Sequence, residues 1–404
     1  MKEGNAMSKL IYLDNAATTQ VYPEVLEAMT PYFTEHYGNP SSIYSFAGES
    51  KRAVDAARST MAEFLNAKTE EIYFTGGGSE SDNWALKATA EAYANKGKHI
   101  ITSKIEHHAI LHTCEWLEKH GFEVTYLDVD ENGLIDPKAL EAAIRPDTIL
   151  ISIMFANNEI GTIEPVAEIG KIAKEHSVLF HTDAVQAFGH VPIDVQAMNI
   201  DMLSASGHKI NGPKGIGLMY IRKGIKIGSF IHGGAQERHR RAGTHNVPGI
   251  VGFAKAVELA GHDMDKRIKY ETELRDYYIS RVEKEIPYAK LNGDRVKRLP
   301  NNTNFCFRFI EGESMLILLD QKGICASSGS ACTSGSLDPS HVLLAIGLPH
   351  EIAHGSLRAT LSEKTTKEDI DFTVDELKKI IERLRGMSPL YEDFVKKQES
   401  GKQA

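Results

Sequence analysis

Between residues 70 and 225, short apolar segments alternate with segments of helical periodicity. The apolar segments, rich in β-branched and aromatic residues, are "EIYFTGGG", "HIITSKIEHHA", "FEVTYLDVD", "TILISIMFANNEIG", "SVLFHTDAVQ", "IDMLSASGHKI" and "GIGLMYIRK". Such segments are typical of buried strands, and intervening stretches such as "PVAEIGKIAKEHS" have the spacing of amphipathic helices. This alternation predicts an α/β fold with a mostly parallel sheet. Ligands of such sheets bind outside the carboxyl ends of the strands, so we interpret the polar residues there as one site.

The size and charge of the chain limit which class of protein it can belong to and which kinds of partner it can bind. A chain of 404 residues is too long for one ordinary hydrophobic core. Its composition, with 42% hydrophobic and 25% charged residues, is typical of globular proteins. The net charge of -9 and the short basic stretch "QERHRRAGTHN" argue against a nucleic-acid partner. The sequence shows neither a signal-peptide pattern nor a long apolar run, which predicts a cytoplasmic protein without a membrane partner. Four cysteines in a chain this long predict reduced thiols.

We predict two domains joined by a long helix. Beyond "HNVPGIVGFAKAVELAG", a charged helical pattern runs from Asp263 to about Glu285 and leads into the second domain. The predicted divisions are residues 1–20 as an N-terminal segment packing with the small domain, 21–262 as the large domain, 263–387 as the small C-terminal domain, and 388–404 as a polar tail. The small domain contains "NNTNFCFRF", the segment around Cys332 and a final helix around "KEDIDFTVDELKKIIERLRG".

A lysine, an acid and an amide follow neighbouring predicted strands. "LFHTDAVQ" ends in Asp183 and Gln186, and one crossover later "SASGHKINGPKG" supplies Ser206, His208 and Lys209. Pyridoxal phosphate needs an amine for its Schiff base and a carboxylate that keeps its pyridine nitrogen protonated, and Lys209 and Asp183 suit these two roles. Lys209 alone would be interpreted as a plain surface lysine. The constellation is what favours the cofactor.

The segment "TGGGSES" lies between a predicted strand and the helical run "DNWALKATAEAY". Free backbone N–H groups at such a helix start form a phosphate site. Judged alone, the segment fits a capping box from Ser79 to Asp82 at least as well, and the charges of Glu80 and Asp82 would oppose a bound anion. It is not a Walker loop, because the terminal Gly-Lys-Ser/Thr is missing.

Further polar residues follow other strand ends. "SKIEHHA" contains His107 and His108, and because neighbouring residues of an extended segment face opposite sides, only one of them can lie over a cofactor ring. An imidazole there could move protons near neutral pH. "FANNEIG" and "GSLRATLS" add Asn157 and Arg358, whose forked guanidinium suits a substrate carboxylate. The plain alternatives are a structural histidine and a surface salt bridge.

The stretch "SSGSACTSGS", residues 327–336, places Cys332 among serines and glycines. This composition is typical of a flexible linker rather than of a packed core. The cysteine is then either a chance thiol in a linker or a nucleophile that can move between a buried site and the surface.

Taken together, the motifs resemble the NifS/IscS-like cysteine desulfurases, which are pyridoxal phosphate enzymes of the class V aminotransferase family. The motifs are, in order, "YLDNAATT", "YGNPSS", "FTGGGSESDN", "NNEIGTIEP", "HTDAVQ", "SGHKINGPKGIG", "QERHRRAGTHN", "SSGSACTSGSLDPSHVL" and "GSLRATLS". The resemblance implies the type I fold of pyridoxal phosphate transferases, with a large domain on a mostly parallel seven-stranded sheet and a smaller α+β C-terminal domain. It also implies conversion of L-cysteine to L-alanine, with the sulfur passed as a persulfide to an iron–sulfur scaffold or another sulfur-acceptor protein.

The resemblance also implies roles for single residues. Lys209 matches the Schiff-base lysine, Asp183 the pyridinium partner and Gln186 the donor to the ring hydroxyl. His107 matches the stacking histidine, which could take the thiol proton of the substrate, and Cys332 matches the cysteine that receives sulfur. The other matched positions are Gly78, Ser79, Ser206 and His208 for the phosphate, Thr244 for a phosphate contact from the neighbouring subunit of a homodimer, and Asn157 and Arg358 for the substrate carboxylate. No metal site is implied. Departures from the family pattern are His239, His245 and Ser79.

Two rival classes of function stay open. An aminotransferase or selenocysteine lyase would keep the fold and the cofactor but would not need Cys332. A metal or iron–sulfur carrier would use Cys325, Cys332 and some of the 17 histidines, although no CxxC pair or HExxH helix supports it. Alanine formation without a keto acid separates the aminotransferase, a comparison of cysteine with selenocysteine separates the lyase, and a yellow chromophore separates the carrier.

Overall fold

The computed structural model describes residues 9–328 and 339–401 and is built around a seven-stranded sheet with the order β2-β8-β7-β6-β5-β3-β4. The strands are β2 (Ile72–Thr75), β3 (His99–Ser103), β4 (Glu123–Leu127), β5 (Thr148–Ser152), β6 (Leu179–Asp183), β7 (Met202–Ser206) and β8 (Gly217–Ile221). Strands β3 to β7 run parallel, whereas β8 runs antiparallel to β2 and β7. The predicted α/β fold with a mostly parallel sheet is confirmed.

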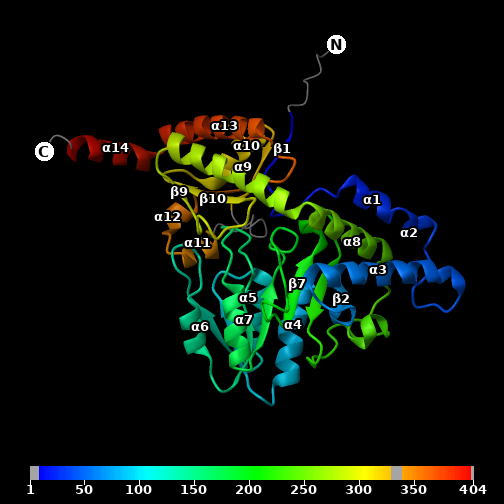
Figure 1. Ribbon diagram of the computed structural model, residues 1–404. Helices are drawn as coiled ribbons and strands as arrows, with labels where there is room; N and C mark the ends of the chain where they lie inside the picture. The colour runs from blue at the N-terminus through cyan, green and yellow to red at the C-terminus, as the bar shows by residue number, and fades with distance from the viewer. Residues whose placement is uncertain (1–8, 329–338, 402–404) are drawn as a thin grey trace, which may run out of the picture.

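Helices cover both faces of this sheet (Figure 1). One face packs against α3 (Gly48–Leu65), α7 (Val166–Glu175) and α8 (Val247–His262), and the other against α4 (Gly78–Tyr93) and α5 (His108–Glu118). Neighbouring residues of one strand go to opposite cores: Ile101 joins the first and Ile100 the second, and both are fully buried. Coverage on both faces is why these strands are continuous apolar runs in the sequence.

A second, smaller core lies above the sheet in Figure 1. It is built from α9 (Met264–Glu285), α10 (Gly312–Asp320), α13 (Lys367–Gly386) and an antiparallel sheet of β12 (Ser356–Thr360), β10 (Asn302–Phe307) and β9 (Ala289–Leu291). Strand β1 (Ile11–Tyr12) pairs with β11 (Ile324–Cys325), and Ile11 and Leu13 enter this core. The two cores agree with a two-domain organisation, whose boundaries stay a prediction.

The predicted polar tail is helical over most of its length. Residues 389–401 form helix α14 (Pro389–Gly401). Its Tyr391 and Phe394 rings lie 5.5 and 4.8 Å from the ring of Phe309, and Phe394 lies 5.2 Å from Tyr288. Two aromatic residues three positions apart share one face of a helix. The many charged residues around them in the sequence made this face hard to recognise.

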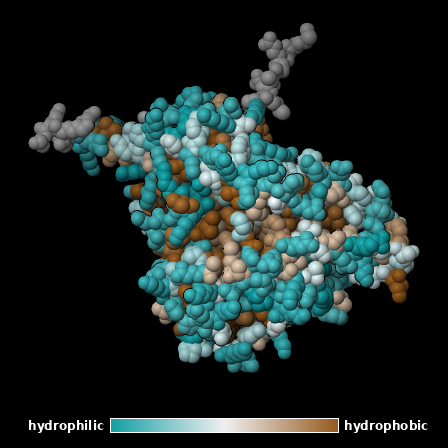
Figure 2. Space-filling view, viewed as in Figure 1, coloured by the Kyte–Doolittle hydropathy of each residue, from teal (hydrophilic) through white to brown (hydrophobic). Residues whose placement is uncertain are grey.

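The remaining elements are short. They are α1 (Pro23–Met29), α2 (Pro31–Thr34), α6 (Pro137–Ala143), α11 (His341–Ala345), α12 (His350–Ala353), and the 3-10 turns η1 (Ser45–Ala47), η2 (Thr69–Glu71), η3 (Gly207–Lys209) and η4 (Gln236–His239). On the face shown in Figure 2, apolar residues gather in a band between the small domain and the central sheet. Among the described residues, we find no helix with the length and apolarity to cross a membrane.

Candidate active site

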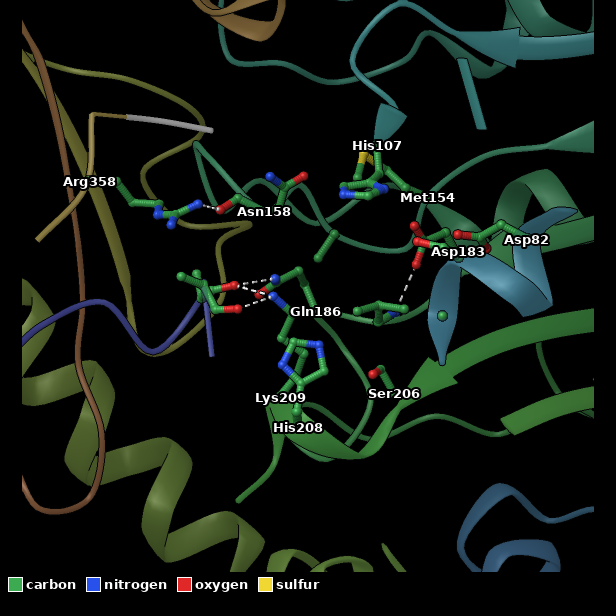
Figure 3. A pocket seen from close by; sticks show the side chains of 16 residues that line it. Asp82, His107, Met154, Asn158, Asp183, Gln186, Ser206, His208, Lys209 and Arg358 are labelled. Atoms are coloured by element: carbon green, nitrogen blue, oxygen red, sulfur yellow. Dashed lines mark hydrogen bonds between the residues drawn. The ribbon is translucent and has the colours of Figure 1, made fainter. Parts of the chain in front are cut away.

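A cavity of about 250 Å³ opens at the carboxyl ends of β6 and β7, where the rule for parallel sheets places ligands (Figure 3). Asp183 ends β6, Ser206 ends β7, and Lys209 ends the turn that follows. The lining residues are Ala16, Ala17, Gly78, Ser79, Asp82, His107, Met154, Ala156, Asn158, Asp183, Val185, Gln186, Ser206, His208, Lys209 and Arg358. Most of the residues singled out in the sequence therefore meet in one place.

Lys209 and Asp183 form the polar centre of this cavity. The Lys209 Nζ donates to the backbone carbonyls of Ala16, at 2.5 Å, and Ala17, at 2.8 Å. The Asp183 Oδ1 accepts from the backbone N–H of Val185 at 2.9 Å. Burial raises the pKa of Asp183 to about 6, although the Val185 N–H and the charge of Lys209 oppose the rise. The Val185 N–H and the charge of Lys209 thus favour the anionic form of Asp183, whereas burial disfavours it.

His107 and Gln186 complete the walls of the cavity. His107 is the N-cap of α5, and its Nδ1 accepts from the backbone N–H of Ala109 at 3.1 Å. Burial, with the nearby charge of Lys209, lowers the pKa of His107 to about 4, so the ring is neutral at physiological pH. A neutral ring whose Nδ1 accepts carries its proton on Nε2. Gln186 donates its Nε2 amide to the carbonyl of Ala16 at 3.0 Å.

The start of helix α4 is open to an anion. Its N-cap is Gly77, which offers no side-chain cap, so the capping box that Ser79 and Asp82 suggested does not form. A Cβ on Gly78 would lie 2.5 Å from Val185 Cγ2, so only glycine allows the backbone this close. Ser79, with Ser206 and His208 from the other side, lines the cavity beside this helix start. Unsatisfied backbone N–H groups and hydroxyls are the donors that a phosphate requires.

Glu80 does not oppose an anion there. It accepts two hydrogen bonds from Arg241, at 2.8 and 3.0 Å, and one from the backbone N–H of Gly76 at 2.8 Å. The guanidinium offsets its charge. An anion site at α4, an acid and an amine over one cavity are the groups that pyridoxal phosphate contacts, so the residues present fit this cofactor.

Arg358 reaches the cavity from β12. Its side chain is almost fully buried, with Nη2 donating to Asp14 at 2.8 Å and Nη1 donating to the carbonyl of Asn158 at 2.9 Å. Its Nε is buried and has no hydrogen-bond partner among the described residues. A guanidinium with an unsatisfied donor at a cavity wall is suited to a carboxylate ligand.

The amide beside Arg358 belongs to Asn158, whereas the sequence singled out Asn157. The Asn157 Nδ2 donates to the carbonyl of Ile105 at 2.8 Å, and its Oδ1 accepts from the backbone N–H groups of Glu159 and Ile160. These bonds hold the loop and leave no amide group for a substrate, so Asn157 is corrected to a structural residue, and Asn158 lines the cavity instead. The sequence did contain a signal for this choice, because neighbouring residues of an extended segment face opposite sides, so only one of the two asparagines can face the cavity. The same rule applies to His107 and His108.

The cavity also contains residues that the sequence did not assign to it. Ala16 and Ala17 supply carbonyls, and Met154 and Val185 supply apolar wall. Cys332 lies outside the described residues. Thr244 is exposed and does not line the cavity, so within one chain it makes no contact with the site.

Thr244 lies in a segment that is fixed by a buried ion cluster. Glu237 accepts from both terminal nitrogens of Arg58, at 2.8 and 2.6 Å, from the backbone N–H of Phe74 at 2.9 Å and from His245 at 2.7 Å. Burial alone would raise the pKa of Glu237, but the hydrogen bonds from Arg58 and His245 outweigh it and lower the pKa to about 2. His245, one of the departures from the family pattern, is thus part of the anchor of this segment.

We expect Glu237→Gln to destabilise the protein by about 3 to 5 kcal/mol, because it leaves the buried Arg58 without its charge partner. The folded pKa lies below the ordinary value of 4.5, so this stabilisation is present above pH 4.5 and is lost as the pH falls toward about 2. Urea unfolding at neutral pH measures the difference. The exposed pair of Arg295 and Glu283 offers the control Glu283→Gln, for which a change below about 1 kcal/mol is expected. Equal effects of the two variants would contradict the prediction.

Comparison with known proteins extends the geometric picture. The family model described as "Aminotransferase class-V" matches residues 11–372. A protein of Methanosarcina thermophila named "Cysteine desulfurase IscS" is 60% identical over 383 residues, covering 95% of this chain and 95% of its own. A protein of the same name from Clostridium botulinum (strain Hall) is 58% identical over 395 residues, covering 97% of this chain and all of its own.

Solved structures give the same result. A structure titled "NIFS-LIKE PROTEIN" has a TM-score of 0.88 and 39% identity, covering 93% of this chain and 100% of its own. A structure titled "SspA in complex with cysteine" has a TM-score of 0.79 and 39% identity, covering 88% of this chain and 100% of its own. Both likenesses extend over the large and the small domain.

Proposed function

The chain belongs to the class-V aminotransferase family and, within it, to the cysteine desulfurases, and we propose that it binds pyridoxal phosphate in this cavity and leaves the sulfur of L-cysteine on Cys332. The observation that supports the cofactor most strongly is the placement of Lys209 and Asp183 in one cavity beside the uncapped start of α4. The product of the reaction is L-alanine.

Each part of the cofactor has a candidate partner. Gly78, Ser79, Ser206 and His208 would hold the phosphate, Asp183 the pyridine nitrogen, Gln186 the ring hydroxyl and His107 the face of the ring. When bound, pyridoxal phosphate supplies an electron-withdrawing ring that weakens the bonds at Cα of an attached amino acid. The buried, neutral His107 suits a ring face better than an ion would, because no charge is desolvated by the contact.

The polar groups of the chain orient and deprotonate the substrate. Arg358 and Asn158 bind the carboxylate of L-cysteine, which takes up the Nε donor that the guanidinium leaves unsatisfied. The amine of Lys209 removes the proton from Cα and later returns a proton to the product. Because Nδ1 of His107 is engaged by Ala109, its ring offers Nε2–H as a donor to the substrate sulfur, and it takes the thiol proton only when that cap bond opens.

Cys332 is the sulfur acceptor in this proposal. Its thiolate attacks the substrate sulfur and forms the new sulfur–sulfur bond, while the bond between sulfur and Cβ breaks. The electron pair of the broken bond stays with the carbon, and protonation there completes the methyl group of L-alanine. The sulfur leaves as a persulfide on Cys332, ready for transfer to a second protein.

We extend the proposal to the partners. Thr244 is exposed on a segment that Glu237 anchors to Arg58, and it does not line the cavity of its own chain. This supports a homodimer in which Thr244 contacts the phosphate of the neighbouring subunit. We further propose that the protein acts in the cytoplasm and that an iron–sulfur scaffold or another acceptor protein takes the persulfide.

One experiment on the purified protein tests the proposal. Addition of L-cysteine without reductant, followed by mass analysis, should add about 32 Da to the peptide containing Cys332 and release alanine without a keto acid. A visible absorption band from bound pyridoxal phosphate should accompany both. Alanine release without the added mass would replace the desulfurase with a lyase. A protein that acquires no absorption band when the cofactor is supplied would overturn the proposal.

We expect Arg358→Lys to raise KM for L-cysteine by about 100-fold and to change kcat much less, because a lysine cannot offer the forked pair of donors to a carboxylate. Steady-state kinetics with L-cysteine measures both constants. The control is Arg295→Lys, which changes an exposed arginine paired with Glu283 and should leave KM unaltered. A loss confined to kcat would argue that Arg358 does not hold the substrate carboxylate.

A further inference from the structure

Two buried carboxyl groups lie close together at one end of the cavity. Asp82, in the N-terminal part of α4, is 1% exposed, and Asp183, at the end of β6, is 5% exposed. One oxygen of each and one ring nitrogen of His107 all lie within 4.8 Å of one another, and Figure 3 shows the two carboxyl groups side by side. Two negative charges this close in a buried site repel each other strongly, so the pair retains a proton.

Their partners decide which of the two carries the proton. Asp183 accepts the Val185 N–H at 2.9 Å and lies near the ammonium of Lys209, both of which favour its anion. The Asp82 Oδ1 is buried and has no hydrogen-bond partner among the described residues. Burial and the charge of Asp183 raise the pKa of Asp82 well above its usual value, and a hydrogen bond from Ser204 opposes the rise only in part.

The neighbours of Asp82 offer no compensating charge. His181 Nε2 lies 3.8 Å from Asp82 Oδ1, but burial lowers the pKa of His181 to about 3. The two nitrogens of the His181 ring contact the hydroxyls of Ser152 and Ser204, which satisfies a neutral imidazole. Glu106, the other carboxyl group that acts on Asp82, is itself fully buried, and burial raises its pKa. His107 is neutral as well.

We propose that Asp82 is a positioning residue: a neutral carboxylic acid that confines the negative charge of the buried pair to Asp183. The charge then lies at the end of β6, in the cavity that Lys209 also lines. The proton on Asp82 also removes a negative charge from the cavity wall near the start of α4, where a bound anion would be repelled. The protonation itself does not depend on the proposed function, although its value for the reaction does.

Infrared spectroscopy tests the protonation directly. At neutral pH, the protein labelled with carbon-13 in its aspartate carboxyl groups should show the shifted carbonyl stretch of a protonated aspartic acid, with and without pyridoxal phosphate. That band should be absent from labelled Asp82→Asn and present in labelled Asp183→Asn with cofactor removed. If the wild-type protein shows no such band, the proposal is overturned without any need for a variant to fold. A band that persists in Asp82→Asn overturns it as well.

Cofactor affinity supplies the second readout, because asparagine copies the shape of a neutral aspartic acid. Asp82→Asn should weaken binding of pyridoxal phosphate by less than about tenfold, and Asp183→Asn by more than about 100-fold. Equal losses in the two variants would show that Asp82 carries charge. Neither measurement uses L-cysteine. If the labelled band behaves as expected while no desulfurase activity is found, the proposed function fails and the assignment of the proton stands.

Discussion

Lys209→Ala is expected to lose the visible absorption band of bound pyridoxal phosphate and to lower alanine formation by more than about 10⁴-fold. The loss is large because one amine serves two purposes: it attaches the cofactor and it moves the proton at Cα. Its position between Asp183 and the carbonyls of Ala16 and Ala17 leaves no other lysine at the cavity wall to replace it among the described residues. Absorption spectra and an alanine assay measure the two effects.

The matched control is Lys226→Ala, because Lys226 is exposed and does not line the cavity. This variant should keep both the absorption band and the activity. Circular dichroism checks that Lys209→Ala keeps its fold. Added methylamine could replace part of the lost proton transfer, and a partial return of activity would separate the missing amine from a general disturbance. A Lys209→Ala protein that still forms alanine at the normal rate would remove Lys209 from the reaction.

The fold and most of the site could be predicted because their signals are local. Each strand of the large sheet is a short apolar run, and Asp183 and Ser206 stand at the ends of two such runs. Parallel strands carry their carboxyl ends to one edge, so residues distant in sequence are brought together without any knowledge of side-chain packing. The prediction of Asn157 failed because a sequence does not show which asparagine forms hydrogen bonds within its own loop. The side chain of Asn157 forms them with Ile105, Glu159 and Ile160.

Other features depend on contacts that a sequence does not show. Arg58 and Glu237 stand 179 residues apart, and nothing in their neighbourhoods indicates that they pair. The neutralisation of Glu80 by Arg241 depends on a contact of the same kind, across 161 residues. Without that contact, the charges of Glu80 and Asp82 counted against a phosphate site at the start of α4. With it, the objection applies to Asp82 alone. The protonation proposed for Asp82 removes the remaining charge.

Cys332→Ala is expected to abolish the persulfide and to lower alanine formation by at least about 10³-fold, because the substrate sulfur then has no nucleophile to receive it. The other three cysteines do not qualify as substitutes. Cys114 and Cys306 are fully buried, and burial raises the pKa of Cys306 to about 11 and that of Cys114 further. Burial also raises the pKa of Cys325, which lowers its thiolate fraction.

Cys325→Ala is therefore the matched control, since it removes a thiol seven positions from Cys332 and should leave both persulfide and alanine formation in place. The readouts are the mass of each cysteine-containing peptide and the rate of alanine release. If Cys332→Ala released alanine normally, the chain would be a lyase that eliminates sulfur without a protein acceptor. If Cys325→Ala lost the persulfide instead, the half-buried thiol beside Tyr12 would be the acceptor, despite its raised pKa. We expect Cys332→Ala to lose the persulfide and Cys325→Ala to retain it. That result would assign sulfur transfer to the glycine- and serine-rich segment that contains Cys332.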